Sequence, residues 1–585
     1  MQTFRFRKTF GAELEAEERT AFTLWAPSSE EVFLEIEGMP AQKMNSDGQG
    51  HFSLTAACGA GARYFFRVSG GQSVPDPASR SQPDGVLGPS VVTNPESYQW
   101  QCPQWQGRPW HEAVIYELHT GLLGGYRGIV QQLDELAALG ITAIELMPIN
   151  SFGGTRNWGY DGVLPYAPAA PYGSPDKLKS LIDAAHARGL MVFLDVVYNH
   201  FGPEGNFLPV YAEAFFDHEK NSTWGTGIAF DKPEVANFFI ENVLYWLMEY
   251  RFDGVRIDAA SAISDHAWFG ALRERVEATI EPGRHVHLIL ENENNDAGLL
   301  RDGFTAQWND DGHNALHVLL TGEYEGYYKM FAKDPTQDLA RVLAEGFVYQ
   351  GQFNPYSGKN RGMASGDLSA TKFILFLQNH DQTGNRALGE RLLSLAKPEA
   401  VKAAYALLLL SPMIPMIFMG EEWGCQTPFY FFCDFHGELA EQVREGRRKE
   451  FSQFPAFQDE KNRKRIPDPN ALETFEASRP ERAARETENG KAWLALTQQL
   501  LALRREWIIP YLHDVQSAGV HVLGHGALCA RWNLDNRKIL TLFINFSENQ
   551  CEISEKNHLL YESSENRPAG LLPALSLVAC VEDVP

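Results

Sequence analysis

Residues 191–200 read Met191-Val-Phe-Leu-Asp195-Val-Val-Tyr-Asn199-His200. A short apolar run that ends in charged and polar residues is typical of a buried parallel strand. The segment before it predicts a helix, because Ser174-Pro175 is a favourable helix start and the apolar residues that follow share one helical face. Those apolar residues are Leu178, Leu181, Ile182 and Ala185. The stretch therefore predicts a helix followed by a strand, as in one β/α unit.

The same alternation of helical segments and apolar runs continues on both sides of this unit. Eight short apolar runs, separated by helical segments, begin near Val114, Ala143, Met191, Phe252, Val286, Phe304, Phe373 and Ile414. Eight parallel strands with intervening helices match a (β/α)₈ TIM barrel. We place this barrel at residues 101–510, with insertions at about 201–232 and 425–490.

Both ends of the chain alternate apolar and polar residues with a period of two, which indicates strands with one buried face. Near the N-terminus this is seen in Ala21-Phe-Thr-Leu-Trp25 and Val32-Phe-Leu-Glu-Ile36, and near the C-terminus in Ile539-Leu-Thr-Leu-Phe543. We predict an N-terminal Ig-like β-sandwich at residues 1–100 and a C-terminal β-sandwich at 511–585. The predicted fold class is α/β, a TIM barrel flanked by two β-sandwich domains.

The composition is that of a folded globular chain with a strongly acidic surface. The 585 residues include 75 Asp and Glu but 51 Lys and Arg, which gives a net charge of −24. Such a surface repels phosphate backbones and anionic lipid headgroups, so neither nucleic acid nor a membrane is an expected partner. Aromatic residues make up 12% of the chain, which suits a flat, uncharged ligand such as a sugar.

The sequence predicts a cytoplasmic protein. No apolar run follows the basic residues between Met1 and Phe10, so no secretory signal is expected. The segment that comes nearest to a membrane span, 401–418, is interrupted by Lys402, Ser411 and two prolines. Seven cysteines without a C-x-x-C pair favour reduced thiols over disulfides or a zinc site.

Four of the predicted barrel strands end in polar residues that could react. They are Asp195, Asn199 and His200 after the third strand, Arg256 and Asp258 after the fourth, Glu291 after the fifth, and Asn379, His380 and Asp381 after the seventh. Any one of them could simply cap the next helix. A barrel gathers its strand ends around one mouth, however, and so many charges would lose hydration there unless they served a site. We therefore predict an active site at this mouth.

Carboxylates without a cysteine or histidine ligand cluster suit the cleavage of a glycosidic bond. Arg256 lies two residues before Asp258, on the same side of the strand, so its charge should lower the pKa of Asp258 and keep this carboxylate a nucleophile. Glu291 would then be the protonated acid that donates to the leaving oxygen. Asp381, beside His380, would bind sugar hydroxyls and help to distort the sugar ring.

Two further residues are expected at the substrate. His200 would contact a sugar hydroxyl, and Tyr160, in Trp158-Gly-Tyr160-Asp161, would offer a stacking face. No cofactor is expected. Asp217 and Asp231 are isolated and no oxygen-rich loop surrounds them, so a calcium site is not expected either.

The motifs at the strand ends resemble the four signature regions of the α-amylase family of glycoside hydrolases and transferases. The matching segments are Asp195-Val-Val-Tyr-Asn-His200, Gly254-Val-Arg-Ile-Asp258, the strand end at Glu291, and Asn379-His-Asp381. The resemblance implies a retaining mechanism in which Asp258 is the nucleophile, Glu291 the acid/base and Asp381 the stabiliser of the transition state. It also implies that the subsite of the attacked glucose is lined by Tyr160, His200, Arg256 and His380.

Longer stretches are similar to those members of this family that hydrolyse the α-1,4 bond next to a terminal trehalose and release trehalose. These stretches include Phe10-Gly-Ala-Glu-Leu14, Asp76-Pro-Ala-Ser-Arg80, Gln307-Trp-Asn-Asp-Asp311 and Phe418-Met-Gly-Glu-Glu422. By this resemblance, the expected partners are maltooligosyl trehalose and related α-glucans.

Other functions stay open at this point. The same catalytic residues would serve an α-1,4-glucan branching or debranching enzyme, which product analysis would distinguish. A non-catalytic barrel acting as a binding or scaffold protein would lack an essential carboxylate, whereas Asp258, Glu291 and Asp381 are all present. The N-terminal sandwich is either a carbohydrate-binding module, as the resemblance suggests, or a packing domain that forms one wall of the cleft.

Overall fold

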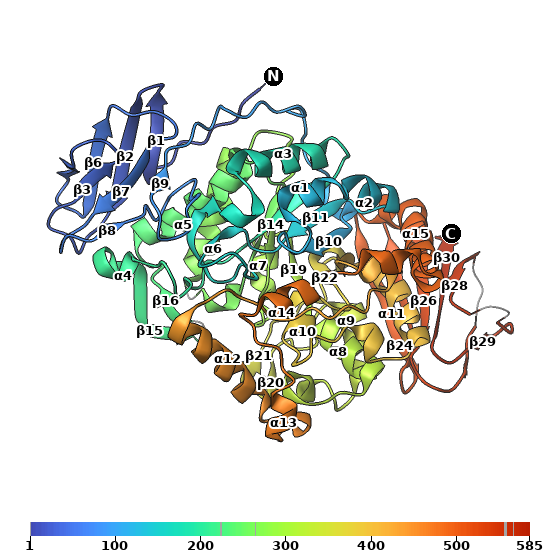
Figure 1. The fold of residues 1–585 in the computed structure, drawn as a ribbon. Helices are drawn as coiled ribbons and strands as arrows, with labels where there is room; N and C mark the ends of the chain where they lie inside the picture. Colours follow the sequence, from blue (N-terminus) through green and yellow to red (C-terminus); the bar gives the residue numbers. More distant parts are fainter. Residues whose placement is uncertain (1, 223–224, 264, 555–557, 565–566, 585) are drawn as a thin grey trace.

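A closed barrel of eight parallel strands forms the centre of the molecule (Figure 1). The computed structural model describes residues 2–222, 225–263, 265–554, 558–564 and 567–584. In their order around the barrel, the strands are β10 (Ile115–Leu118), β11 (Ala143–Leu146), β14 (Met191–Val196), β17 (Gly254–Ile257), β18 (His287–Leu290), β19 (Ala306–Trp308), β22 (Phe373–Leu375) and β23 (Ile414–Phe418). Each strand begins at or within two residues of its predicted start. The predicted TIM barrel is therefore confirmed.

The barrel strands are apolar because both of their faces are covered. Helices lie outside the barrel, and a cluster of apolar side chains fills its interior. Members of this interior cluster include Ile115, Phe193, Ile289, Trp308, Ile374 and Met416. In β14 all six residues are buried, which explains the continuous apolar run in its sequence.

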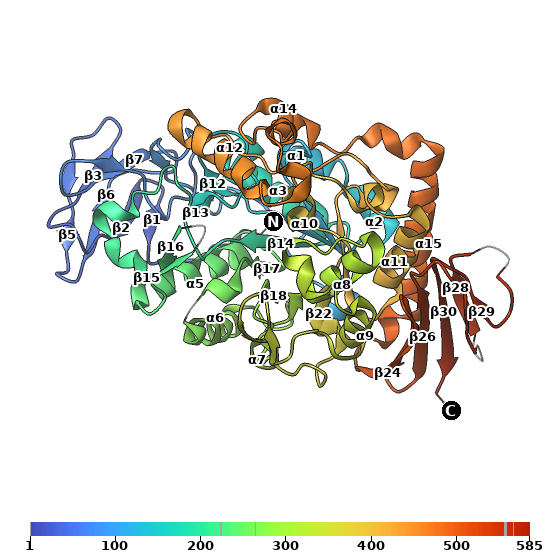
Figure 2. The same cartoon turned by 90° about the horizontal axis from the view of Figure 1, so that it is seen from below.

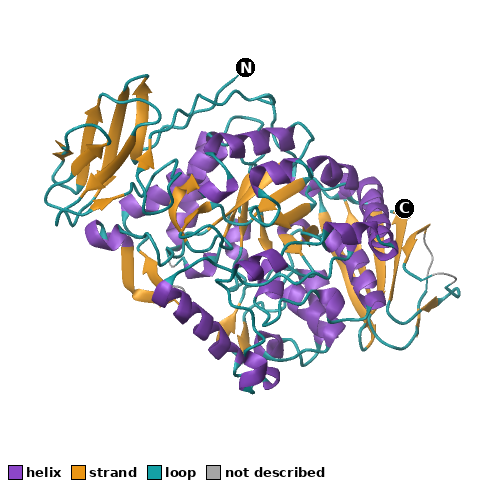
Figure 3. Cartoon of the chain, in the orientation of Figure 1, coloured by secondary structure: helices purple, strands orange, loops and turns teal. Residues whose placement is uncertain are grey.

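The helices around the barrel follow the predicted pattern. Helix α3 (Pro175–His186) begins directly after Ser174, and the four residues of its predicted apolar stripe are fully buried. The other helices that connect barrel strands or follow the last one are α1 (Gly125–Val130), α2 (Leu133–Leu139), α5 (Pro233–Met248), α6 (His266–Thr279), α7 (Ala297–Arg301), α8 (Asp310–Thr321), α9 (Pro335–Glu345), α10 (His380–Gly384), α11 (Pro398–Leu410) and α15 (Glu488–Trp507). Figure 3 shows these helices in purple around the orange strands.

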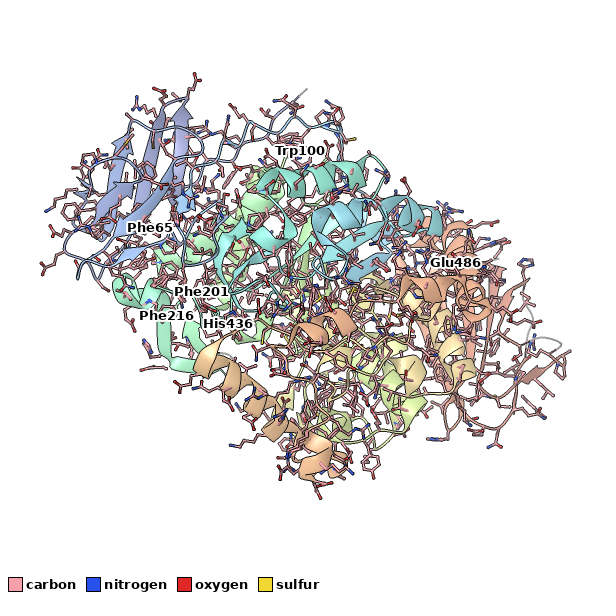
Figure 4. The ribbon with its side chains drawn as sticks, in the orientation of Figure 1. Phe65, Trp100, Phe201, Phe216, His436 and Glu486 are labelled. Carbon is pink, nitrogen blue, oxygen red and sulfur yellow. The ribbon has the colours of Figure 1, made fainter. Side chains whose placement is uncertain are left out.

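The two long predicted insertions carry structure of their own. Residues 201–232, after β14, hold α4 (Leu208–Tyr211) and a hairpin of β15 (Phe216–Ser222) and β16 (Gly225–Ile228). The rings of Phe201 and Phe216, both labelled in Figure 4, pack edge to face with their centroids 6.2 Å apart. Residues 425–490, after β23, hold α12 (Gly437–Phe451), α13 (Glu460–Arg463) and α14 (Leu472–Ala477).

Two hairpins near the barrel mouth are not predicted by the sequence. After β11, β12 (Asn150–Phe152) pairs with β13 (Gly162–Pro168), and after α9, β20 (Gln352–Asn354) pairs with β21 (Lys359–Arg361). Strand β13 contains two prolines, and β20 and β21 are three mostly polar residues each. None of these segments shows the apolar alternation that indicates a strand.

Two antiparallel sheets form the N-terminal part of the molecule, drawn in dark blue in Figure 1. One sheet has the order β1-β2-β6-β5, and the other has the order β4-β3-β7-β8 with β9 paired to β7. Their strands are β1 (Gly11–Ala16), β2 (Arg19–Trp25), β3 (Phe33–Ile36), β4 (Gln42–Lys43), β5 (Asn45–Ser46), β6 (His51–Ala56), β7 (Arg63–Arg67), β8 (Ser73–Val74) and β9 (Ser90–Val91). Phe22, Leu24 and Leu34 are buried, as the period-two pattern predicts.

Buried charges join these sheets to the barrel. Lys8 Nζ lies 2.9 Å from Glu249 Oε2 and 3.2 Å from Glu13 Oε1. Arg80 Nη2 donates to Glu13 at 2.9 Å, and Lys179 Nζ is 3.9 Å from the other oxygen of Glu249. None of these five residues, which we call the junction network, is more than 8% exposed. Each carboxylate of the junction network therefore has cationic partners.

The C-terminal part is a five-stranded antiparallel sheet with the order β24-β25-β26-β30-β28, accompanied by the small pair β27-β29. Their bounds are β24 (Val515–Gly524), β25 (Ala527–Leu534), β26 (Lys538–Asn545), β27 (Cys551–Glu552), β28 (His558–Glu562), β29 (Leu571–Leu572) and β30 (Ser576–Asp583). The sheet packs against α9 and α11, and Trp532 Nε1 donates to the carbonyl of Leu343 at 3.1 Å. Phe543, Ile553 and Leu572 form a separate small core beneath the β27-β29 pair.

The sheets at the two ends of the chain lie at opposite ends of the molecule, with the barrel between them (Figure 2). The predicted fold class, a TIM barrel with a β-sandwich region on either side, is thus confirmed. The domain boundaries near residues 100 and 510 stay predictions.

Candidate active site

Six of the seven side chains predicted for the site line one cleft. The cleft has a volume of about 1520 Å³, and its lining includes Tyr160, His200, Asp258, Glu291, His380 and Asp381. The seventh residue, Arg256, is fully buried beneath it. Asp258 and Glu291 are the first residues after the neighbouring strands β17 and β18, so the barrel itself brings them to the same mouth.

Arg256 holds the two central carboxylates at one point. Its Nη1 donates to Asp258 Oδ1 at 2.7 Å, and its Nη2 lies 2.9 Å from Glu291 Oε2. Nη1 also contacts both carboxyl oxygens of Asp195, at 2.8 and 2.7 Å. The guanidinium lies over the ring of Trp308, 4.0 Å from its centroid. Asp258 and Glu291 therefore face the same cavity, although they are far apart in the sequence.

The charge balance around Asp258 differs from the expectation based on Arg256 alone. Burial raises the pKa of Asp258, Arg256 lowers it, and the neighbouring carboxylates Glu291, Asp195 and Asp381 raise it again. The pKa of Asp258 lies well above its ordinary value of 3.8, so the prediction of a lowered pKa is wrong in its net direction. The reason is that one guanidinium serves several buried carboxylates. A site with more carboxyl groups than cations binds protons more readily than isolated carboxylates do, as acid catalysis requires.

Asp381 lies beside His380 at the start of α10, as predicted. Asn379 caps this helix, because its Oδ1 accepts the backbone N–H of Asp381 at 2.8 Å. His380 Nε2 is 3.5 Å from Asp381 Oδ1, and on the other side of the ring Nδ1 donates to Glu117 Oε1 at 2.5 Å. Burial lowers the pKa of His380, but Asp381 and Glu117 outweigh burial and raise it to about 9. His380 is therefore a cation at neutral pH.

We use the name mouth cluster for Asp195, Arg256, Asp258, Glu291, His380 and Asp381. Tyr160 and His200 are tied to this cluster by hydrogen bonds. The Tyr160 hydroxyl donates to Asp195 Oδ2 at 2.6 Å, and His200 Nε2 lies 2.9 Å from the carbonyl oxygen of Tyr160. The Tyr160 ring also stacks on His380, with centroids 5.0 Å apart and planes at 23°. One side of the predicted stacking face of Tyr160 is thus covered by His380.

Three buried acidic residues of the site received no role from the sequence. Glu117, Glu145 and Asp195 are each 1% exposed and lie on β10, β11 and β14. Within the described residues, both carboxyl oxygens of Glu145 lack a hydrogen-bond partner, and burial raises its pKa well above 4.5. A charged residue inside an apolar strand, as in Ile115-Tyr-Glu-Leu118 and Ala143-Ile-Glu-Leu146, is the signal that indicates such groups.

Beyond the mouth cluster, aromatic side chains line much of the cleft. The loop after α8 contributes Tyr324 and Tyr327, the β20–β21 hairpin contributes Tyr356, and the insertion after β23 contributes Phe454. These side chains offer apolar faces, which suit sugar rings. Among the described residues, the lining begins at Trp158, so the N-terminal sheets form no wall of this cleft.

Three other features of the described residues bear on cofactors and location. No three His, Cys, Asp or Glu side chains among them are arranged to hold a metal ion. None of the helices drawn for these residues has the length and apolar character needed to cross a membrane. The cysteines among these residues form no disulfide bond with one another.

Known proteins share both the sequence and the architecture of this chain. Residues 45–224 match the family model of the alpha amylase catalytic domain. A Deinococcus radiodurans protein named malto-oligosyltrehalose trehalohydrolase is 39% identical over 551 residues, which cover 90% of this chain and 90% of that protein. A protein of the same name from Saccharolobus solfataricus is 41% identical over 76% of this chain and 81% of its own length. A crystal structure of a protein from Salmonella typhimurium, provisionally described as an alpha amylase, superposes on this chain with a TM-score of 0.93 and 44% sequence identity. The superposition covers 98% of this chain and 100% of the Salmonella chain.

Proposed function

Because the chain belongs to the α-amylase family of glycoside hydrolases, and within it to the malto-oligosyltrehalose trehalohydrolases, we propose that it hydrolyses the α-1,4-glucosidic bond next to the terminal trehalose of maltooligosyl trehalose. The products are free trehalose and a shortened maltooligosaccharide, so the reaction contributes to trehalose biosynthesis. The observation that carries the proposal is the Arg256 guanidinium, which contacts Asp258 and Glu291 at 2.7 and 2.9 Å in one cleft.

The mechanism follows from the positions of these two carboxyl groups. Asp258 attacks the anomeric carbon while Glu291 gives its proton to the leaving oxygen, and trehalose departs. Water then attacks the covalent glucosyl intermediate, and Glu291 takes the proton of that water. Two carboxyl groups that contact the two terminal nitrogens of one guanidinium lie close together, which supports a retaining rather than an inverting mechanism.

The other residues of the site act on the glucose that is attacked. Asp381 accepts hydrogen bonds from its hydroxyls, and its negative charge stabilises the positive charge that develops on the ring. The cationic His380 donates a hydrogen bond to a hydroxyl and so orients the sugar. His200 and Tyr160 complete the subsite. Arg256 fixes the orientation of Asp258 from below, because it is fully buried and has no direct access to the sugar.

A branching or debranching enzyme of the same family is the alternative function. The catalytic carboxylates do not separate the two, but the trehalohydrolase from Deinococcus radiodurans aligns with 90% of this chain. A non-catalytic barrel is less well supported, since Asp258, Glu291 and Asp381 all line one cleft.

One pair of incubations tests the proposed substrate. Purified protein is mixed with maltopentaosyl trehalose or with maltoheptaose, which has the same number of glucose units, and the products are separated by anion-exchange chromatography. We expect rapid release of trehalose from the first and much slower hydrolysis of the second. New α-1,6 links, the loss of existing ones, or equal rates on both substrates would contradict the proposal. The Glu291→Gln variant is the control for contaminating activity.

The proposed location is the cytoplasm, as predicted from the sequence. The lack of disulfide bonds among the described cysteines supports it, because thiols stay reduced in that compartment.

A further inference from the structure

The buried carboxylate of Glu117 contacts His380 at two places. Glu117 Oε1 accepts the Nδ1–H of the imidazole at 2.5 Å, and Oε2 accepts the backbone N–H of His380 at 3.2 Å. Both residues are 1% exposed; Glu117 lies within the first barrel strand, β10, and His380 is the first residue of α10, the helix after the seventh barrel strand. One carboxylate thus fixes both the ring and the main chain of His380.

Aromatic rings hold the imidazole in this orientation. Tyr160 stacks on it with centroids 5.0 Å apart, and Trp158 packs against it edge to face at 5.5 Å. With Nδ1 held by Glu117, the other nitrogen, Nε2, faces Asp381 Oδ1 at 3.5 Å. The ring therefore lies between two carboxylates, one at each nitrogen.

This arrangement restricts the protonation state of His380. A neutral imidazole has a single N–H, and a carboxylate at Nδ1 would keep that hydrogen on Nδ1. Nε2 would then present a lone pair to the acceptor oxygen of Asp381, which is unfavourable. Only the imidazolium donates on both sides. The negative charge of Glu117 is thus matched to a doubly protonated His380.

The charges around His380 agree with this state. The titratable and charged groups that act on it from the surrounding elements are Glu117, His119, Glu145, Asp195, Arg256 and Asp381. Glu145, which lies opposite Glu117 on β11, has no hydrogen-bond partner among the described residues, and burial raises its pKa well above its ordinary value. Burial thus favours the protonated form of Glu145, whereas Glu117 contacts His380 directly and is its counter-ion.

We propose that Glu117 is a positioning residue for the reaction: its charge keeps His380 doubly protonated, so that Nε2–H is directed at Asp381 and at a hydroxyl of the attacked glucose. The sugar contact rests on the proposed function. The protonation of His380 does not, because it follows from groups within the chain.

The Glu117→Gln variant tests the role of this charge, since it keeps the size of the side chain and one acceptor oxygen. We expect the titration midpoint of His380, followed by NMR in protein labelled with ¹⁵N-histidine and assigned with a His380→Gln sample, to fall from about 9 toward the ordinary value of 6.5. A fall of about two units would reduce the doubly protonated fraction at pH 8 roughly tenfold. The alkaline limb of the kcat/KM profile should move to lower pH by the same amount, with little loss at pH 6.

Two matched variants separate charge from packing. Glu117→Asp restores the charge and should return the midpoint close to 9 even if the longer contact lowers kcat. Glu145→Gln changes the neighbouring buried carboxyl, whose pKa is raised by burial and which does not contact His380 through a hydrogen bond, and should leave both the midpoint and the alkaline limb in place. A midpoint that stays near 9 in Glu117→Gln, or that falls equally in Glu145→Gln, would overturn the proposal. If the midpoint moves but no trehalose is released from maltooligosyl trehalose, the proposed function fails together with the sugar contact, whereas the control of His380 protonation by Glu117 stands.

Discussion

The two groups of buried charged residues in this molecule, the junction network and the mouth cluster, differ in the ratio of cations to carboxylates and in the direction of their pKa shifts. In the junction network, cations surround each carboxylate, and although burial raises the pKa of Glu249, Lys8 and Lys179 outweigh it and lower this pKa below 4.5. In the mouth cluster, carboxylates outnumber cations, and burial with like-charged neighbours raises the pKa of Asp258 and of Asp381. The first arrangement stabilises the ionised form of its carboxylates. The second destabilises the ionised form, because the carboxylates repel one another.

The difference shows how buried charge divides between structure and chemistry. Paired charges at the junction, where three cations face two carboxylates, hold the N-terminal sheets against the barrel, and none of these residues lines the cleft. Unbalanced carboxyl groups at the mouth lower the stability of the fold, but they supply both a nucleophile and an exchangeable proton. Substitutions in the two groups should therefore have opposite effects on activity and stability.

The largest expected effect is that of Asp258→Asn on activity. Loss of the nucleophile should lower kcat by at least roughly 10⁴-fold. The melting temperature should stay unchanged or rise, because one of several crowded carboxyl groups is removed. Steady-state kinetics with maltooligosyl trehalose and a thermal melt measure the two effects. Activity near that of the wild type, or a clear drop in melting temperature, would remove Asp258 from the proposed role.

Glu291→Gln should lower kcat by about 10²- to 10⁴-fold, the range typical of a lost general acid. An α-glucosyl fluoride, whose leaving group needs no proton, should form the glucosyl intermediate in the variant nearly as fast as in the wild type. The rate of fluoride release in the pre-steady state is the measurement. Equal losses on the fluoride and on the natural substrate would mean that Glu291 is not the acid.

Glu249→Gln tests the junction network. Removing this carboxylate leaves Lys179 and Lys8 buried with less compensation, so we expect a loss of about 3–5 kcal/mol in the free energy of unfolding. At temperatures where the variant is folded, kcat should not change. Glu31→Gln is the matched control, because Glu31 pairs with Lys43 at the surface and should matter little for stability. If Glu249→Gln lost activity without losing stability, the junction network would not differ from the mouth cluster in the way proposed.

The smallest expected effect is a separation of two acid transitions. Since the pKa of Asp258 and of Asp381 is raised, these groups take up protons above pH 3.8 as the pH falls, and activity is lost there. The lowered pKa of Glu249 has the opposite sign: the stabilisation by this carboxylate is present above its unfolded value of 4.5 and is lost only as the pH falls below that value. Parallel measurements of kcat/KM and circular dichroism from pH 7 to pH 3 should show activity falling before the fold. Coincident transitions would contradict this.

Much of the architecture could be predicted because barrel strands are continuous apolar runs. The starts of all eight strands follow from this signal, as does the stripe of α3. The hairpins β12–β13 and β20–β21 could not be predicted, since they are short, polar or proline-containing segments held by their surroundings. Their positions depend on tertiary contacts, such as the ion pair of Arg361 with the buried Asp311 at 3.0 Å.

The candidate site shows the same division. Asp258, Glu291, Asp381 and their predicted neighbours follow strand ends, where polar residues stand out against apolar runs. Glu117 and Glu145 lie within strands, where an isolated acidic residue carries no sign of what it faces across the barrel. The direction of the pKa shift at Asp258 was also out of reach, because it depends on burial and on three carboxylates from other strands. The two-residue spacing between Arg256 and Asp258 predicts only the contact between these two side chains.

The most direct test of the proposed retaining mechanism is to identify the residue that carries the glucosyl intermediate. The enzyme is treated with 5-fluoro-α-glucosyl fluoride, which slows the second step, then digested at low pH, and the labelled peptide is sequenced by mass spectrometry. We expect a single adduct on Asp258. An adduct on Glu291, Asp381 or any other side chain would contradict it.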